Sequence, residues 1–222
     1  MPHQTFFNLP EEKRQSVIDA ALEEFSLHDY KTASLSRMVE KAGIAKGSMY
    51  QYFDNKKDLY LYLIDYAAQV KLTYLSQMSD PGRQNFFDLF KDISRNSTRF
   101  NLSQPKYSRL LYHAAREKYN EELGDLAAQL REVARNYIKD IMLAARERGE
   151  IRKDIDIDLA SFCINQISID LEDYVSARYG FSYSEILKEG KESLPLTPDQ
   201  VEEVLTDVIN FFRQGLEARS PE

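Results

Sequence analysis

The chain is predicted to fold as an all-α protein, and three observations support this prediction. Glycine and proline together make up 15 of the 222 residues, about 7% against an average usage of about 12%, so turn-forming residues are scarce. Between these residues, apolar side chains recur at spacings of three and four, which is typical of amphipathic helices. No segment alternates between apolar and polar residues for long enough to indicate a sheet.

The first two helices are predicted from their ends and from their apolar faces. Pro10 begins the first helix, because proline suits the first turn. Apolar residues then fall on one face at helical spacing: Val17, Ile18, Ala21, Leu22 and Phe25. Ser34 is a good N-cap for a second, short helix. Gly43 ends that helix, since glycine readily adopts the left-handed conformation found just past a helix end.

Further helices follow along the rest of the chain. A third short helix is predicted to carry Met49 and Phe53 on its inward side. Asp54-Asn55 then caps a long fourth helix that ends before Pro81-Gly82. The remaining apolar pattern predicts helices at about 84–100, 105–117, 120–148, 156–178, 183–190 and 199–217.

Residues 34–53 have the layout of a helix-turn-helix, with two short amphipathic helices joined by Gly43-Ile44-Ala45. In this motif the second helix enters the major groove of DNA. Its outward face is predicted to carry hydrogen-bonding groups, aromatic hydroxyls and a positive charge, which suit phosphates and base edges. The candidate DNA-binding residues are Ser34, Arg37, Ala45, Lys46, Gly47, Ser48, Tyr50, Gln51, Tyr52 and Lys56.

Some of these candidates have a specific predicted role. Gln51, which shares the outward face with Ser48 and Tyr52, has the amide needed to read an adenine in bidentate fashion. Lys56, at the start of the fourth helix, is expected to contact a phosphate. For Arg37 two interpretations remain: it contacts a phosphate, or it is a plain surface charge. On composition alone, six of the candidates are equally consistent with a solvated helix face: Lys46, Ser48, Tyr50, Gln51, Tyr52 and Lys56.

The run Ser34–Leu59 resembles the DNA-binding domain of the TetR family of bacterial transcriptional regulators. The resemblance rests on the core AGIAKGSMYQYF, residues 42–53, followed by NKKDL, residues 55–59. It covers roughly residues 10–71. The segment Gly149–Asp156 also resembles the junction before the penultimate long helix of the family.

The resemblance implies an all-helical, Ω-shaped homodimer. Three N-terminal helices would bind DNA, and a larger C-terminal domain would dimerise and bind a small molecule. On this basis residues 1–57 are predicted to form the helix-turn-helix domain, and residues 58–222 the effector-binding and dimerisation domain. The expected function is that of a cytoplasmic transcriptional repressor, released from a palindromic double-stranded DNA operator when an effector moves the fourth helix. The alternative is a helical ligand-binding or interaction module without DNA binding.

Aromatic residues on the helices that the family uses around its ligand cavity are candidates for effector contacts. An aromatic at helical spacing nevertheless belongs to a core more often than to a ligand wall. Asp170 interrupts an apolar stretch; it is either a counter-ion for a cationic effector or an acid at the dimer rim or in solvent. The effector-binding candidates are Phe86, Phe90, Tyr107, Tyr112, Tyr137, Phe162, Asp170 and Tyr174.

The last two long helices are predicted to form a four-helix bundle with the same helices of a second copy. Their apolar residues would pack between the subunits. These residues are Ile164, Ile167, Leu171, Tyr174, Val201, Val204, Leu205, Val208, Ile209 and Phe212.

Other classes of function find little support in the sequence. The three histidines are far apart and fit no metal-site spacing, and neither a phosphate-binding loop nor a G-x-S-x-G motif is present. We therefore predict no enzymatic activity, metal or cofactor. No apolar stretch approaches the about 20 residues that span a membrane. Cys163, between Phe162 and Ile164, is predicted to be a buried structural thiol, with a redox switch as the alternative.

The net charge of −7 is unevenly distributed along the chain. Between Lys31 and Lys57 there are six basic and two acidic residues, a net charge of +4, so the rest of the chain carries −11. We therefore expect a basic DNA-binding end attached to an acidic body. Such a charge distribution would orient the protein on a duplex.

Overall fold

The computed structural model describes residues 1–76, 85–117, 119, 121–182, 185–186, 189 and 195–218. Across these residues the regular structure is helical, which confirms the all-α prediction. The described backbone forms no β-strand; Ile151 and Glu217 form an isolated antiparallel bridge. None of the helices in this part of the chain combines the length and the hydropathy needed to cross a membrane.

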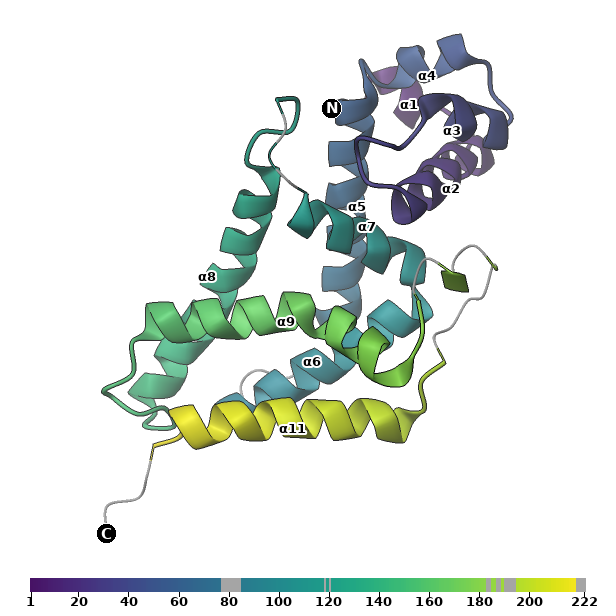
Figure 1. Ribbon diagram of the computed structural model, residues 1–222. Coiled ribbons are helices and arrows are strands. Elements are labelled where there is room, and N and C mark those ends of the chain that lie inside the picture. The colour runs from purple at the N-terminus through teal and green to yellow at the C-terminus, as the bar shows by residue number, and fades with distance from the viewer. Residues whose placement is uncertain are drawn as a thin grey trace.

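The helices form two groups connected by a long helix (Figure 1). In chain order they are α1 (Gln4–Phe7), α2 (Glu11–Leu27), α3 (Leu35–Lys41), α4 (Lys46–Tyr52), α5 (Lys56–Ser76), α6 (Phe86–Ser103), α7 (Pro105–Arg116), α8 (Leu126–Glu147), α9 (Ile157–Tyr179) and α11 (Pro198–Leu216). Helices α1–α4 gather at one end of the molecule, and α5 runs from them toward α6. Helices α6, α9 and α11 lie at the opposite end.

The predicted elements agree with the structure except at a few places. The pattern does not predict α1, because four residues are too few to show a helical period. Helix α8 begins at Leu126 rather than near residue 120, since Gly124 adopts a left-handed φ of 59°, which a right-handed helix excludes. The predicted end at Pro81-Gly82 lies outside the described residues. So does most of the predicted helix at 183–190.

Both ends of α3 have the capping chemistry that the sequence predicts. The Ser34 side chain accepts a hydrogen bond from the backbone N–H of Arg37 at 3.4 Å, as an N-cap does. Gly43 has a left-handed φ of 66°, and the N–H of Ile44 donates to the carbonyl of Val39 at 3.0 Å. This arrangement uses a carbonyl that the end of α3 would otherwise leave unbonded.

An ion pair between buried Glu24 of α2 and the half-exposed Arg37 of α3 holds the two helices together. The Glu24 carboxylate accepts from Nε of Arg37 at 3.0 Å and from the backbone N–H of Ser34 at 2.8 Å. Burial alone would raise the pKa of Glu24, but the hydrogen bonds from Arg37 and Ser34 and the charge of Arg37 lower it overall. The ionised form of Glu24 therefore stabilises the helix pair.

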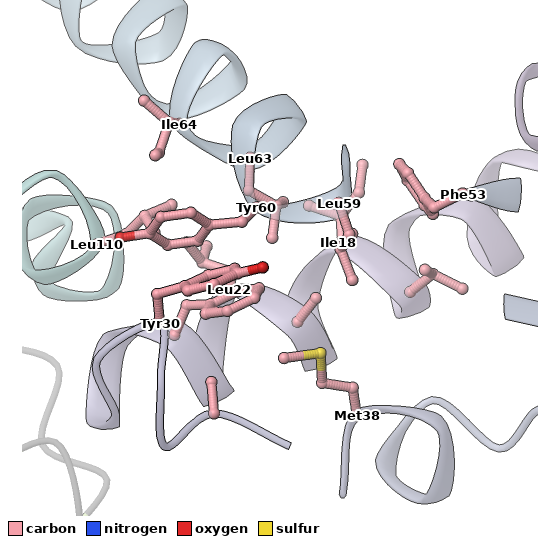
Figure 2. Close-up of a cluster of buried hydrophobic side chains, with 14 of the residues drawn as sticks. Ile18, Leu22, Tyr30, Met38, Phe53, Leu59, Tyr60, Leu63, Ile64 and Leu110 are labelled. Atoms are coloured by element: carbon pink, nitrogen blue, oxygen red, sulfur yellow. The ribbon is translucent and has the colours of Figure 1, made fainter. Parts of the chain in front are cut away.

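One hydrophobic cluster joins the N-terminal helices to α5 and α7 (Figure 2). Tyr60 of α5 is fully buried, and its ring centroid lies 4.7 Å from that of Phe25 and 5.0 Å from that of Tyr30. Leu110 and Ala114 of α7 belong to the same cluster. The helix-turn-helix therefore shares its core with two helices that follow it in the chain.

A second hydrophobic cluster fills the other end of the molecule. It contains Phe86 and Phe90 of α6, Met142 of α8, Ile164 of α9 and Phe212 of α11. The rings of Phe90 and Phe212 meet edge to face with centroids 6.1 Å apart. This cluster holds α9 and α11 against α6 and α8.

The shared cluster predicts a large difference between two leucines of α5. Leu63 is 0% exposed and Leu72 is 59% exposed. We expect Leu63→Ala to lower the free energy of unfolding by about 2–5 kcal/mol, because it leaves a cavity in the core. Leu72→Ala should change it by less than about 0.5 kcal/mol. Urea denaturation measures both values, and equal losses would contradict the assignment of this core.

The Glu24–Arg37 pair predicts a pH-dependent contribution to stability. A carboxylate whose pKa is lowered by folding stabilises the protein above its unfolded pKa, and this stabilisation disappears as the pH falls through the folded pKa. Glu24→Gln should therefore be destabilising near about pH 7, and its difference from the wild type should shrink below about pH 4.5. Glu12→Gln, an exposed change on the same helix, is the control. Urea denaturation at several pH values tests this, and a difference that does not change with pH would be inconsistent with an ionic role.

Candidate DNA-binding surface

Helix α4 lies on the outer side of the N-terminal group, at the end of the molecule opposite α11 (Figure 1). Met49 and Phe53 are buried and hold the helix against the shared cluster, as the sequence predicts. The side chains of Lys46, Tyr50 and Gln51 remain exposed. Helix α4 therefore presents one polar face that nothing in the described chain covers.

Six of the ten predicted DNA-binding residues lie together on or next to this face. Five of them are exposed and Ser48 is half-buried. The six are Ala45, Lys46, Gly47, Ser48, Tyr50 and Gln51. No ion pair within the described chain involves Lys46, so its charge remains available to a ligand.

Tyr52 does not share the exposed face, contrary to the prediction. Its side chain is only 5% exposed and its ring centroid lies 6.0 Å from that of Phe6. The reason is α1, which covers the side of α4 where Tyr52 projects. Tyr52 is a core residue that helps to hold α4 in place.

The predicted phosphate contact of Lys56 is also replaced by internal contacts. The ammonium donates to the carbonyls of Tyr30 at 2.7 Å and Ala33 at 3.2 Å, and it lies 4.5 Å from the centroid of the Tyr30 ring. The two carbonyl oxygens thus occupy N–H donors of the Lys56 ammonium that a phosphate would need. Lys56 therefore fastens the start of α5 to the loop between α2 and α3.

Ser34 and Arg37 have structural partners as well. Ser34 is the N-cap of α3, and the Arg37 guanidinium binds Glu24 and the carbonyl of Thr32, the latter at 3.2 Å. Arg37 is thus neither a plain surface charge nor an unpaired cation facing a phosphate. The charge of Arg37 is largely compensated within the protein.

The distribution of charge differs from the expected basic end. Lys41 pairs with Glu23, and Glu23 also accepts from Lys106 at 2.9 Å. Residues 1–57 contain eight basic and eight acidic side chains, so this part of the chain has no net charge. The net positive charge of the segment from Lys31 to Lys57 is offset by acids of α2 and by Asp29, which that segment does not include. Within α4 itself, the positive charge comes from Lys46.

The eight predicted effector-binding residues do not line a single pocket. Phe86 and Phe90 belong to the second hydrophobic cluster, whereas Tyr107 packs against the first. The remaining aromatics on α8 and α9 are about half exposed or more: Tyr137, Phe162 and Tyr174. Most of these aromatics therefore pack in a core or lie on the surface.

Tyr112 and Asp170 lie in a surface network around Arg116. The Arg116 guanidinium binds Asp170 and Asp173, and Tyr112 donates to Asp173 at 2.5 Å. The guanidinium also stacks 4.4 Å from the centroid of the Tyr112 ring. Asp170 thus already has a cationic partner within the protein.

A polar cluster that the sequence did not reveal lies between α5, α6, α7 and α9. Glu172 accepts from Asn101 at 2.7 Å and from Ser108 at 3.0 Å, and Lys71 donates to Asn101 at 3.3 Å. The second carboxylate oxygen of Glu172 is buried and accepts no hydrogen bond within the described chain. Burial lowers the pKa of Lys71 and raises that of Glu172, although each charge partly offsets the effect on the other. The only hint in the sequence is a lysine within the apolar pattern of α5.

The outer faces of α9 and α11 carry an exposed apolar surface. Leu159, Phe162, Tyr174 and Phe211 are between 50% and 69% exposed. A groove between the two helices is lined by Ile167, Tyr174, Arg178, Val204, Asp207, Val208 and Phe211. Cys163 is exposed on the same side of α9, so the prediction of a buried thiol is wrong.

The structure therefore exposes only part of the predicted set of subunit-contact residues. Five of the ten are buried within their own chain, although Val204 also lines the groove. They are Ile164, Val204, Leu205, Ile209 and Phe212. An amphipathic pattern identifies an apolar face but does not tell which side of a helix meets its own core when both sides carry apolar residues.

Comparisons with known proteins agree with this architecture. A family model described as "Bacterial regulatory proteins, tetR family" matches residues 17–63. The crystal structure of a TetR family transcriptional regulator from Chloroflexus aurantiacus J-10-FL is 32% identical in sequence, with a TM-score of 0.81. That likeness covers 99% of this chain and 100% of the other. The similarity therefore extends through both groups of helices.

Two further relatives are more distant. A fatty acid metabolism regulator protein of Bacillus subtilis (strain 168) is 24% identical over 151 residues, which cover 67% of this chain and 75% of that protein. The fatty acid degradation regulator FadR from Bacillus halodurans has a TM-score of 0.65 at 18% identity, and the match covers 91% of this chain and 99% of FadR. Both of these proteins are named as regulators. This chain belongs to the TetR family and is a transcriptional regulator with a DNA-binding helix-turn-helix.

Proposed function

We propose that this regulator is a homodimeric repressor that binds a palindromic DNA operator and is released by a small-molecule effector. The observation that carries the DNA-binding part is the uncovered polar face of α4, with Lys46, Tyr50 and Gln51 exposed on a helix anchored by Met49 and Phe53. In this proposal Gln51 reads a base edge. Lys46 neutralises a phosphate. Residues 1–57 act as the DNA-binding domain, and residues 58–222 bind the effector and the partner subunit.

The apolar surface of α9 and α11 supports dimerisation. Exposed aromatic and aliphatic side chains that line a groove on two neighbouring helices are typical of a protein interface. In a two-fold dimer the same surface of each copy meets the other, so these two helices would form a four-helix bundle. A dimer would also place two copies of α4 on successive major grooves if they lie about 34–36 Å apart, which explains a palindromic operator.

Helix α5 supports a link between the effector and the operator. Its first half belongs to the core under α4, and Lys71 in its second half belongs to the polar cluster with Asn101 and Glu172. An effector that bound near this cluster and favoured another position of α5 would change the separation of the two α4 helices. It would act only through its different affinity for the two states. We place the protein in the bacterial cytoplasm, where its operator would be.

Selection of binding sites from random double-stranded DNA tests the proposed function. We expect a palindromic site whose affinity falls steeply as salt rises, because binding releases counterions from phosphates. Failure to recover a site, or an affinity that does not change with salt, would favour the alternative of a helical ligand-binding or interaction module without DNA binding.

Two variants of α4 separate base reading from phosphate contact. Lys46→Ala should weaken binding to every sequence and lower the slope of log affinity against log salt by about 2 for a dimer. Gln51→Ala should instead change which base is preferred at one position of each half-site. Lys153→Ala, an exposed lysine in the turn between α8 and α9, is the control and should bind as the wild type does. A uniform loss from Gln51→Ala would contradict its role as a base reader.

The proposed dimer interface predicts that Phe211→Glu separates the subunits. Phe211 is 69% exposed on α11, and a charge at the centre of an apolar interface would be left without a partner. Val133, which is 71% exposed on α8, provides the matched control Val133→Glu. Sedimentation equilibrium should show a monomer for Phe211→Glu and a dimer for Val133→Glu. A dimer in both cases would place the interface elsewhere.

A further inference from the structure

The segment that contains α1 lies against the C-terminal end of α4 (Figure 1). Helix α4 has only seven residues, and its C-cap, Phe53, is in an extended conformation with φ −139° and ψ 138°. It therefore lacks the left-handed glycine that ends α3, and its last carbonyls need other donors. The α1 segment supplies these donors.

Three hydrogen bonds connect this segment to the last turn of α4. The backbone N–H of His3 donates to the carbonyl of Tyr52 at 2.8 Å. Nδ1 of His3 lies 3.2 Å from the carbonyl oxygen of Gln51, and the Thr5 hydroxyl donates to the same oxygen. Two side chains from outside the helix thus hold the backbone of Gln51, whose side chain is exposed beside them.

The same segment also anchors the junction between α4 and α5. Nε2 of His3 lies 2.8 Å from the carboxylate of Asp54. Phe6 is fully buried, and its ring centroid lies 4.9 Å from that of Phe53 and 5.5 Å from that of Tyr62. The α1 segment is therefore bound both to the end of the recognition helix and to the helix that follows.

We propose that the α1 segment is a positioning element for DNA recognition, in which His3 and Thr5 fix the backbone of Gln51 without contacting DNA themselves. This inference rests on the proposed function of α4 as the recognition helix. A two-turn helix is marginal on its own, because too few backbone hydrogen bonds offset the cost of ordering it. External donors at its C-terminal end reduce the motion that binding would otherwise have to arrest. Base selectivity at the Gln51 position then depends on residues that do not touch the base.

A pair of substitutions at Thr5 tests the proposal. Thr5→Val has the same shape and lacks the hydroxyl, whereas Thr5→Ser keeps it. We expect Thr5→Val to weaken binding to the selected operator by about tenfold in the dimer, since one hydrogen bond is lost in each subunit. Thr5→Ser should restore most of this affinity. Gln4→Ala is the control on the same helix, because within the described chain the Gln4 side chain bonds only to Asn8 of its own segment.

Selectivity and local dynamics distinguish positioning from general stability. For Thr5→Val, the affinity ratio between the operator and an operator changed at the Gln51-dependent base should fall, while the thermal unfolding midpoint stays close to that of the wild type. Hydrogen exchange of the backbone amides in the last turn of α4 should become faster. His3→Asn, which keeps a donor near the Nδ1 position, should retain more selectivity than His3→Leu.

The outcomes separate this inference from the function on which it rests. If the wild type selects no operator, the proposed function fails, and the positioning role fails with it. If the wild type selects an operator and Thr5→Val binds it with unchanged affinity and selectivity, only the positioning role is overturned. A loss in Thr5→Val that Thr5→Ser does not restore would also overturn it, because the hydroxyl would then not be the cause.

Discussion

The arrangement of the whole N-terminal end depends on the burial of Tyr60 and its neighbours on α5. Helices α2, α3 and α4 are too few and too short to enclose a core by themselves, and the first half of α5 supplies the missing apolar side chains. Leu110 and Ala114 of α7 cover the same cluster from the other side. The position of α4 is therefore determined by packing with helices that belong to the rest of the molecule.

Polar contacts also join the N-terminal helices to α7 and to the turn before α8, and this boundary is called the junction below. Lys106 of α7 binds Glu23 of α2 at 2.9 Å, and Tyr30 donates to Glu122 in the turn before α8. Burial, together with the nearby charge of Arg109, lowers the pKa of His113 on α7 to about 4, so this histidine is neutral at physiological pH. The ionic contact between Lys106 and Glu23 at the junction therefore does not depend on the charge of His113.

The local features of the helix-turn-helix could be predicted from the sequence, because they depend on residues that are close together in the chain. The Ser34 cap, the Gly43 turn and the inward Met49 follow from spacing and from backbone preference. Contacts between distant segments do not follow in this way. Glu24 meets Arg37, and Lys56 meets the carbonyl of Tyr30, only because α2, α3 and α5 pack together. Each of these contacts changed a residue from a DNA-binding candidate into a structural one.

The C-terminal part shows a different limit of sequence patterns. Helices α9 and α11 have apolar residues on more than one side, since one side meets the second cluster and another is exposed. A period of 3.6 residues identifies such helices but does not assign each side to its neighbour. The polar cluster around Glu172 is equally hidden, because its members come from four helices and no two share a motif.

The bridge between Ile151 and Glu217 has a mechanical consequence for these two helices. The N–H of Arg152 donates to the carbonyl of Leu216 at 2.9 Å, and the N–H of Ala218 donates to that of Glu150 at 3.0 Å. These bonds join the end of α11 to the turn that leads into α9. The two helices are thus joined at one end by backbone hydrogen bonds. If the groove between them widens by rotation about this joined end, the displacement increases along α9 from Leu159 toward Arg178.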